Sequence, residues 1–165
     1  MDKYYYLISQ LPLLYFDKET YIDIDSFLEE SHKWMKESDF NCLKLIDINH
    51  THLRKSDHPV HRAYKEFEID LRTELAEFRK ARKEGHGYKS SLFPETITKE
   101  NNPLEAEKEL MKIRWEFIEE LKTGHHFDFG FLVLYYLELQ IQARLEAFDK
   151  EKGMEKFKQY TEVEL

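Results

Sequence analysis

The strongest hydrophobic pattern in the chain runs from Asp128 to Lys152. An unbroken apolar run, 131–137, leads into a periodic one with spacings of three and four, which is one face of an α-helix. A second apolar face lies beside it, formed by Leu132, Tyr136, Leu139 and Ala143. A helix that is apolar on two faces must be covered by at least two others, so the pattern predicts a central helix at about 128–152. Asp128 is its expected N-cap, and Gly153 is expected to follow its last turn.

Two further stretches have the periodicity of long amphipathic helices. At about 60–83, apolar residues recur at spacings of three and four, and Gly85-His86-Gly87 then ends the helix. At about 103–123, Asn102-Pro103 supplies an N-cap and a first helical residue, and Gly124 ends the stretch. Together these patterns predict an all-α fold, a helical bundle around a central C-terminal helix.

The remaining segments give weaker patterns. Residues 4–16 are rich in β-forming aromatics, but no second strand is available to pair with them. We therefore predict a short helix broken before Pro12, with a strand as the alternative. Shorter helices are expected from Asp25 or Ser26 through Trp34, and from Ser38 through Ile46. Residues 84–102 lack periodicity and are predicted to be an irregular, mobile connection within one domain, 1–165.

Composition limits the class of protein. With 33 acidic and 25 basic residues, the net charge of -8 argues against nucleic-acid binding, which needs a concentrated basic surface. The single cysteine, Cys42, rules out an intrachain disulfide and fits a reducing compartment; its apolar neighbours predict that it is buried. No signal peptide is recognisable, and the apolar run 131–137 is far shorter than the roughly 20 residues of a membrane span. We expect a soluble, cytoplasmic protein.

Four histidines, His50, His52, His58 and His61, lie within or beside a loop-like segment. Imidazoles this close could converge on zinc, but their spacing matches no zinc signature. We therefore assign no metal ligand, and a metal-dependent helical enzyme that uses this cluster remains an alternative hypothesis. The chain has no glycine-rich phosphate loop and no nucleophile elbow. We assign no catalytic residue and no cofactor, and we expect the protein not to be an enzyme.

Four arginines are candidate contacts for a partner. Arg72, Arg79 and Arg82 follow the helix at 60–83 among many carboxylates, where they form either a solvated face with pairs such as Glu68–Arg72 or a surface for an acidic partner. Arg144 falls between the two apolar faces of the central helix. Its stem covers the core, or its guanidinium pairs with a carboxylate inside the bundle or with an acidic group of a partner.

The opening Tyr4-Tyr5-Tyr6-Leu7-Ile8-Ser9-Gln10-Leu11-Pro12 and its continuation to Phe16 resemble the start of a bacterial family. Members of that family are encoded beside the subunits of V-type (A/V-type) ATPases. Three further segments look similar to it: 40–48, Phe67-x4-Arg72-x-Glu74-Leu75 with Arg79, and 115–153, which includes Tyr135-Tyr136-Leu137-x-Leu139-Gln140-Ile141 and Arg144.

The resemblance implies distant kinship to the C/d family of central-stalk proteins in rotary ATPases. In that family, helical bundles form a socket between the rotor shaft and the membrane ring, and this chain is much shorter than a full socket. The implied role is a non-catalytic subunit that supports ATP-driven ion transport, on the cytoplasmic face of the membrane. Its partners would be other V-type ATPase subunits, contacted through the arginines and Tyr4 to Tyr6. A helical adaptor with an unrelated partner is the other alternative.

Overall fold

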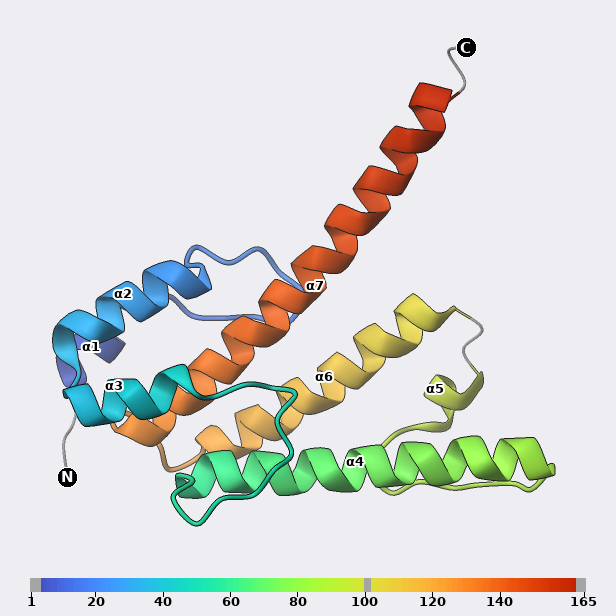
Figure 1. The fold of residues 1–165 in the computed structure, drawn as a ribbon, viewed down its shortest axis with the longest axis horizontal. Coiled ribbons are helices and arrows are strands. Elements are labelled where there is room, and N and C mark those ends of the chain that lie inside the picture. Colours follow the sequence, from blue (N-terminus) through green and yellow to red (C-terminus); the bar gives the residue numbers. More distant parts are fainter. Residues whose placement is uncertain (1–3, 100–101, 163–165) are drawn as a thin grey trace.

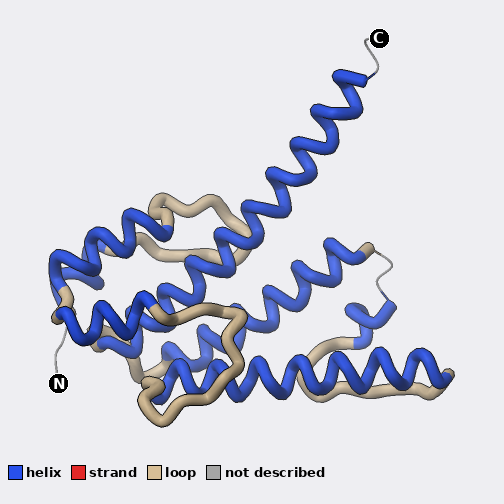
Figure 2. The backbone as a smooth tube through the Cα atoms, viewed as in Figure 1, coloured by secondary structure: helices blue, strands red, loops and turns tan. Residues whose placement is uncertain are grey.

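The computed structural model describes residues 4–99 and 102–162, and within these residues the chain forms helices and no strand (Figures 1 and 2). This confirms the predicted all-α fold. The helices are α1 (Tyr5–Gln10), α2 (Ile24–Trp34), α3 (Glu37–Lys44), α4 (Pro59–Glu84), α5 (Glu95–Lys99), α6 (Pro103–Lys122) and α7 (Phe129–Glu162).

Three long helices make the frame of the molecule. Helices α6 and α7 form an antiparallel hairpin, and α4 packs against both, as Figure 1 shows. Helices α2 and α3 contact α7 from another side, so its first half is surrounded. Leu132, Leu134, Leu137 and Ile141 are accordingly fully buried. Helix α7 is the central helix that its two apolar faces predicted.

Local chemistry explains the ends of these helices. Asp128 caps α7, because its Oδ1 accepts from the backbone N–H of Phe131 at 2.9 Å. Asn102 caps α6 in the same way, accepting from Leu104 N–H at 3.1 Å. Gly85 ends α4 in the left-handed conformation, with φ of 73°. These boundaries follow the predictions to within one or two residues.

Helix α7 does not end at Gly153, contrary to the prediction. It continues to Glu162, and its last turns project beyond the bundle (Figure 1). A glycine costs a helix interior only about 1 kcal/mol relative to alanine, and the residues that follow are mostly good helix formers. The residues after Gly153 are therefore helical as far as Glu162. Its large apolar side chains are exposed: Met154, Phe157 and Tyr160.

The N-terminal third contains one confirmed prediction and several corrections. Helix α1 ends before Pro12, so the strand alternative is wrong for the described residues. Helix α2 is capped by Asp23, not by Asp25 or Ser26, because the Asp23 carboxylate accepts from Ser26 N–H at 2.7 Å. Helix α3 begins at Glu37, one residue before the expected start.

Three side chains expected in the core are exposed. Cys42 lies two residues after the buried Phe40, and a step of two residues turns a helix by about 200° to its other side. Trp34 is half exposed and its ring contacts that of Tyr6 at the surface, with centroids 4.3 Å apart and ring planes tilted by 56°. Ala143 is exposed at the edge of the second apolar face of α7.

Residues 84–102 are not a wholly irregular connection. They contain helix α5, whose Ile97 is buried together with Phe93 just before the helix. These two side chains join a second hydrophobic cluster with Leu71, Leu75 and Leu110 from α4 and α6. Because Phe93 and Ile97 are buried in this cluster, the segment packs against α4 and α6. Residues 100–101 of the predicted connection lie outside the described residues.

Candidate functional site

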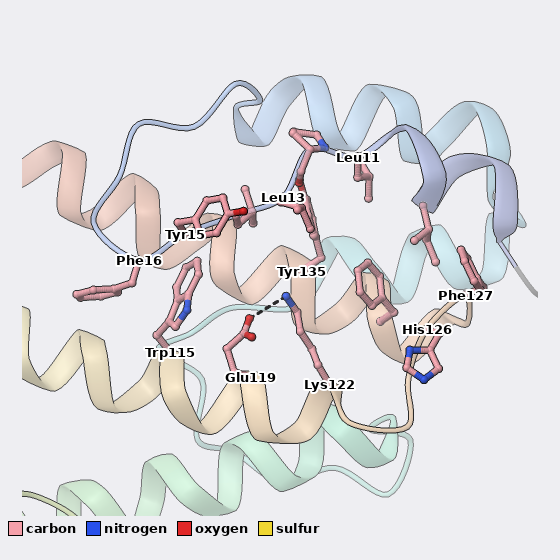
Figure 3. Close-up of a pocket in the computed structure, with 14 residues that line it drawn as sticks. Leu11, Leu13, Tyr15, Phe16, Trp115, Glu119, Lys122, His126, Phe127 and Tyr135 are labelled. Carbon is pink, nitrogen blue, oxygen red and sulfur yellow. Dashed lines mark hydrogen bonds and ion pairs between the residues drawn. The ribbon is translucent and has the colours of Figure 1, made fainter.

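A pocket of about 580 Å³ lies between residues 11–16 and the α6–α7 hairpin (Figure 3). Extended backbone after α1 forms one wall. Trp115 of α6, Phe131 and Tyr135 of α7, and Phe127 of the turn between them form much of the rest. The volume falls within the range of roughly 300–1,000 Å³ typical of ligand pockets, and the walls are mainly apolar.

Side chains of α7 hold residues 11–16 in place. The Tyr135 hydroxyl donates to the carbonyl of Pro12 at 2.7 Å, and the Gln142 amide donates to the carbonyl of Tyr15. Before α1, the backbone N–H of Tyr4 donates to the carbonyl of Phe127 at 2.6 Å. An extended segment has no helical partners for its backbone groups, so these bonds replace them. Burial raises the pKa of Tyr135, which keeps its hydroxyl protonated as a donor.

Four exposed aromatic side chains lie beside the pocket and form what we call the aromatic patch: Tyr5, Tyr6, Trp34 and Phe127. Their exposed fractions are 51%, 55%, 49% and 41%. The Tyr5 and Phe127 ring centroids are 4.8 Å apart and those of Tyr6 and Trp34 are 4.3 Å apart, both pairs in a tilted arrangement. Phe127 also lines the pocket, so the two features are continuous. Tyr and Trp are enriched among the residues that dominate the energy of protein–protein interfaces.

Two charged residues that line the pocket, Glu119 and Lys122, form a cluster with Glu138. The Lys122 ammonium lies 3.1 Å from Glu119 Oε1 and also contacts the Glu138 carboxyl group (Figure 3 shows the Glu119–Lys122 pair). Burial raises the pKa of the fully buried Glu138 to about 9 despite this ammonium, and a hydrogen bond from Glu138 lowers the pKa of Glu119. At neutral pH the cluster therefore holds one proton on Glu138 and one neutralised ion pair.

This arrangement favours a structural role for the cluster. A general acid must reach its substrate, whereas Glu138 is fully enclosed between α6 and α7. Sequence analysis missed Glu138, although a single carboxylate directly after the apolar run 131–137 was a signal that could have identified it.

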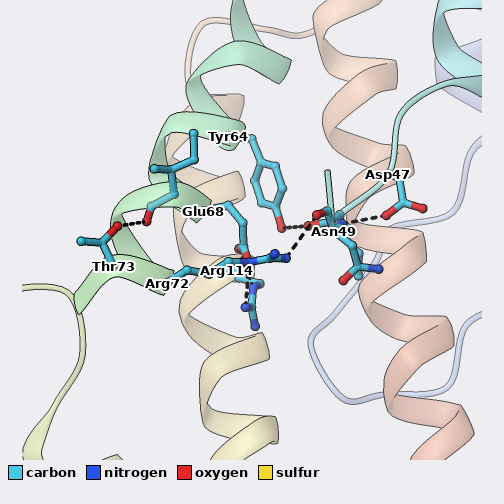
Figure 4. A network of polar contacts seen from close by, with 9 residues as sticks. Asp47, Asn49, Tyr64, Glu68, Arg72, Thr73 and Arg114 are labelled. Atoms are coloured by element: carbon cyan, nitrogen blue, oxygen red, sulfur yellow. Dashed lines mark hydrogen bonds and ion pairs between the residues drawn. The ribbon is translucent and has the colours of Figure 1, made fainter. Parts of the chain in front are cut away.

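Arg72, a predicted contact residue, belongs to a network between α4, α6 and the loop before α4 (Figure 4). Its guanidinium donates to Glu68 Oε1 at 2.8 Å, which confirms the predicted Glu68–Arg72 pair, and to the carbonyl of Asn49 at 3.2 Å. Glu68 is fully buried and also accepts two bonds from Arg114, at 2.7 and 2.9 Å. Arg114 was not predicted; its only sequence signal is a charge between Ile113 and Trp115.

The other candidate arginines lie at the surface. Arg79 and Arg82 are exposed on the second half of α4. Arg144 is exposed on α7, and its guanidinium lies 5.1 Å from the centroid of the Phe148 ring, a cation–π contact. Arg144 thus covers the core residue Phe148, which agrees with the alternative that its side chain lies over the core.

The four histidines do not converge. His50 and His52 are exposed, the ring of His58 packs edge-on against Phe129, and His61 is buried. Among the described residues, no three His, Cys, Asp or Glu side chains are placed to hold one metal ion. The four histidines that are close in sequence are therefore spread over a loop and the start of α4.

Within the described residues, the fold is an all-α bundle with an apolar pocket and an exposed aromatic patch. A family model described as "Protein of unknown function (DUF2764)" matches residues 88–163, which include α5, α6 and α7. No curated protein and no solved structure matches the chain. In the part of the chain that the structure describes, no helix has both the length and the apolar content needed to cross a bilayer.

Proposed function

We propose that this protein is a non-catalytic subunit of a bacterial V-type ATPase, a component of the central stalk that couples ATP-driven rotation to ion transport. One observation carries the proposal: the separate segments that resemble the ATPase-associated family pack around α7. Residues 4–16, 40–48 and 115–153 are far apart in sequence but are joined by hydrogen bonds in the fold.

Two polar side chains of α7, Tyr135 and Gln140, form these hydrogen bonds. Tyr135 binds the carbonyl of Pro12, as described above. Gln140 donates from Nε2 to the carbonyl of Ile46 at 2.8 Å and accepts at Oε1 from Ile48 N–H at 2.9 Å. Both residues belong to the 115–153 segment. The resemblance therefore describes one continuous structural unit, in which α7 fixes the positions of the other segments.

The structure has two properties that a stalk component needs. Its long helices α4 and α6 are joined by hydrogen-bonded ion pairs such as Glu68–Arg114. Contacts of this kind make the bundle rigid, which suits an element that transmits torque. Its aromatic patch offers an anchor for a neighbouring subunit, because large amphipathic rings bury much area at little entropic cost. We infer that the patch and the adjoining pocket contact the rotor shaft or the membrane ring, and that Arg79 and Arg82 contact acidic groups of the same complex.

The test is affinity purification of the tagged full chain from native bacterial membranes, with partners identified by mass spectrometry. We expect the catalytic and rotor subunits of a V-type ATPase to be recovered in comparable amounts. Tyr6→Ala combined with Trp34→Ala should reduce that recovery at least tenfold, because hot-spot aromatics contribute about 2 kcal/mol or more each. Tyr21→Ala is the matched control, since this tyrosine is fully exposed outside the patch.

The outcomes separate the role in the ATPase from the contact surface. If the unmodified chain recovers no ATPase subunit, the proposed function is wrong. If the double variant recovers as much as the unmodified chain, the role in the ATPase stands and the aromatic patch is not the contact. Arg79→Glu and Arg82→Glu, measured in the same experiment, should weaken recovery if those arginines meet acidic groups.

A further inference from the structure

A second pocket, of about 460 Å³, lies between the loop before α4 and α4 itself, and we call it the loop pocket. It is lined by Asn49, His50, Thr51, His52, Arg54 and Lys65. Every one of these side chains carries an N–H or O–H donor, and none is a carboxylate. We propose that the loop pocket binds the phosphate group of a small phosphorylated molecule.

Side chains of α4 donate hydrogen bonds to the backbone carbonyl groups of the loop and hold it in place. Lys65 donates to the carbonyl of His52 at 2.8 Å, and Arg72 donates to that of Asn49 at 3.2 Å. Arg62 donates to the carbonyl of Arg54. These bonds engage backbone oxygens that would otherwise repel an anion, and they fix the loop before any ligand arrives. Such preorganisation lowers the entropic cost of binding.

Two cationic groups are positioned for a phosphate. Lys65 is almost fully buried, and two of its three ammonium donors bind the His52 carbonyl and the Asp57 carboxylate, the latter at 3.0 Å. Lys65 also lines the loop pocket. Arg54 is exposed, and its guanidinium makes no hydrogen bond or ion pair with any of the described residues. A guanidinium of this kind matches the geometry of a phosphate with two parallel bonds.

The balance of charge favours an anion over a metal ion. Asp57 offsets Lys65, so Arg54 leaves the lining with a net positive charge. His61, behind the loop, has its pKa lowered to about 4 by burial and by the charge of Lys65. The same ammonium that resists a proton on His61 resists a metal cation there.

The size of the pocket indicates the class of ligand. A volume of about 460 Å³ is in the range of small-molecule pockets, roughly 300–1,000 Å³. Thr51 and Asn49 add neutral donors beside the cations, as polyphosphate and sugar-phosphate ligands require. The inference concerns a different surface from the aromatic patch, so it does not depend on the proposed role in the ATPase.

The experiment is a titration of the ¹⁵N-labelled full chain followed by NMR, first with inorganic phosphate and then with ATP. Sodium chloride at matched ionic strength is the reference titration. We expect saturable shifts of the backbone amides between Asn49 and Arg54. Arg54→Ala should weaken binding at least tenfold, as loss of a charge-assisted bidentate contact predicts. Lys80→Ala, at an exposed cation on the second half of α4, should bind like the unmodified chain.

The proposal is overturned if the loop amides shift as much with chloride as with phosphate, or if Arg54→Ala binds both probes as tightly as the unmodified chain. Because Arg54 is exposed, this variant should fold normally, and an unchanged NMR spectrum outside the loop would verify that. Equal affinity for both probes would identify the phosphate group alone as the ligand. Tighter binding of ATP would show that the rest of the pocket holds the nucleoside.

Discussion

Arg114 of α6 donates two hydrogen bonds to the buried carboxylate of Glu68 on α4, from Nε at 2.7 Å and Nη2 at 2.9 Å. This bidentate contact crosses the interface between two of the three long helices (Figure 4). Desolvation opposes the charged form of Arg114, but its bonds to the Glu68 carboxylate and the charge of that carboxylate outweigh desolvation and raise the Arg114 pKa. Each charge can remain in the interior only because the other is there.

Arg114→Met should lower the free energy of unfolding by about 3–5 kcal/mol, because it leaves Glu68 charged, buried and without its main partner. Arg72→Met should cost about 1 kcal/mol or less, since the Arg72 side chain is 47% exposed and its pair with Glu68 is screened by water. Urea denaturation of the two variants measures the difference. Adding Glu68→Leu to Arg114→Met should restore much of the loss; equal costs for the two single variants would contradict this account.

Gln140→Ala should destabilise the protein by about 1–3 kcal/mol, because it leaves the Ile46 carbonyl and the Ile48 N–H without their side-chain partner. Hydrogen exchange should show faster exchange of the Ile48 amide, with α4 and α6 little changed. Gln10→Ala, an exposed glutamine at the end of α1, is the control and should alter neither quantity. Unchanged protection of Ile48 in Gln140→Ala would show that the loop is held by other contacts.

Glu138 should make stability fall with rising pH in the alkaline range. The unfolded chain releases this proton near the ordinary pKa of 4.5, whereas the folded chain keeps it to about pH 9. Between these values the folded state binds more protons, so the free energy of unfolding decreases as pH rises, by up to about 1.4 kcal/mol per pH unit. Denaturation at pH 7, 8 and 9 should show this slope.

Glu138→Gln should flatten the slope, because the amide keeps a neutral group of the same shape beside Glu119 and Lys122. It should also make the protein more stable than the unmodified chain at pH 8. Glu120→Gln, at an exposed neighbouring position, should leave the slope unchanged. If Glu138→Gln has the same slope as the unmodified chain, Glu138 does not carry the buried proton.

Two glycines of α7 should respond oppositely to replacement by alanine. Gly153→Ala should stabilise the protein by about 0.5–1 kcal/mol, because Gly153 is within the helix and its added Cβ would meet no atom within 4 Å. Gly130→Ala should destabilise it, because its Cβ would lie 2.6 Å from Nδ1 of His125, the atom that binds Asp128 at 2.8 Å.

Thermal denaturation followed by circular dichroism measures both changes, and the helical signal reports on the end of α7. A Gly153→Ala variant with unchanged stability would indicate that the helix ends near that residue in solution, as the sequence pattern alone suggested.

The long helices could be predicted because their signals are local. Periodicity of three and four residues identified α4, α6 and α7, and the caps Asn102 and Asp128 and the stop at Gly85 use only neighbouring backbone groups. The same local rules failed at Gly153, where a modest glycine penalty was read as a stop. The apolar neighbours of Cys42 likewise led to the wrong prediction that it is buried. Those neighbours do not show which side of α3 faces the core.

The sequence by itself determined the all-α class and the central position of α7, because both follow from hydrophobic spacing along one helix. Only the tertiary structure decided which charged groups are buried. Glu68 meets Arg114 across 46 positions of sequence, and Glu138 meets Lys122 across 16. The first pocket and the aromatic patch are assembled in the same way from distant segments. Periodicity reports the faces of a helix, whereas the partner of a buried charge depends on how those faces pack.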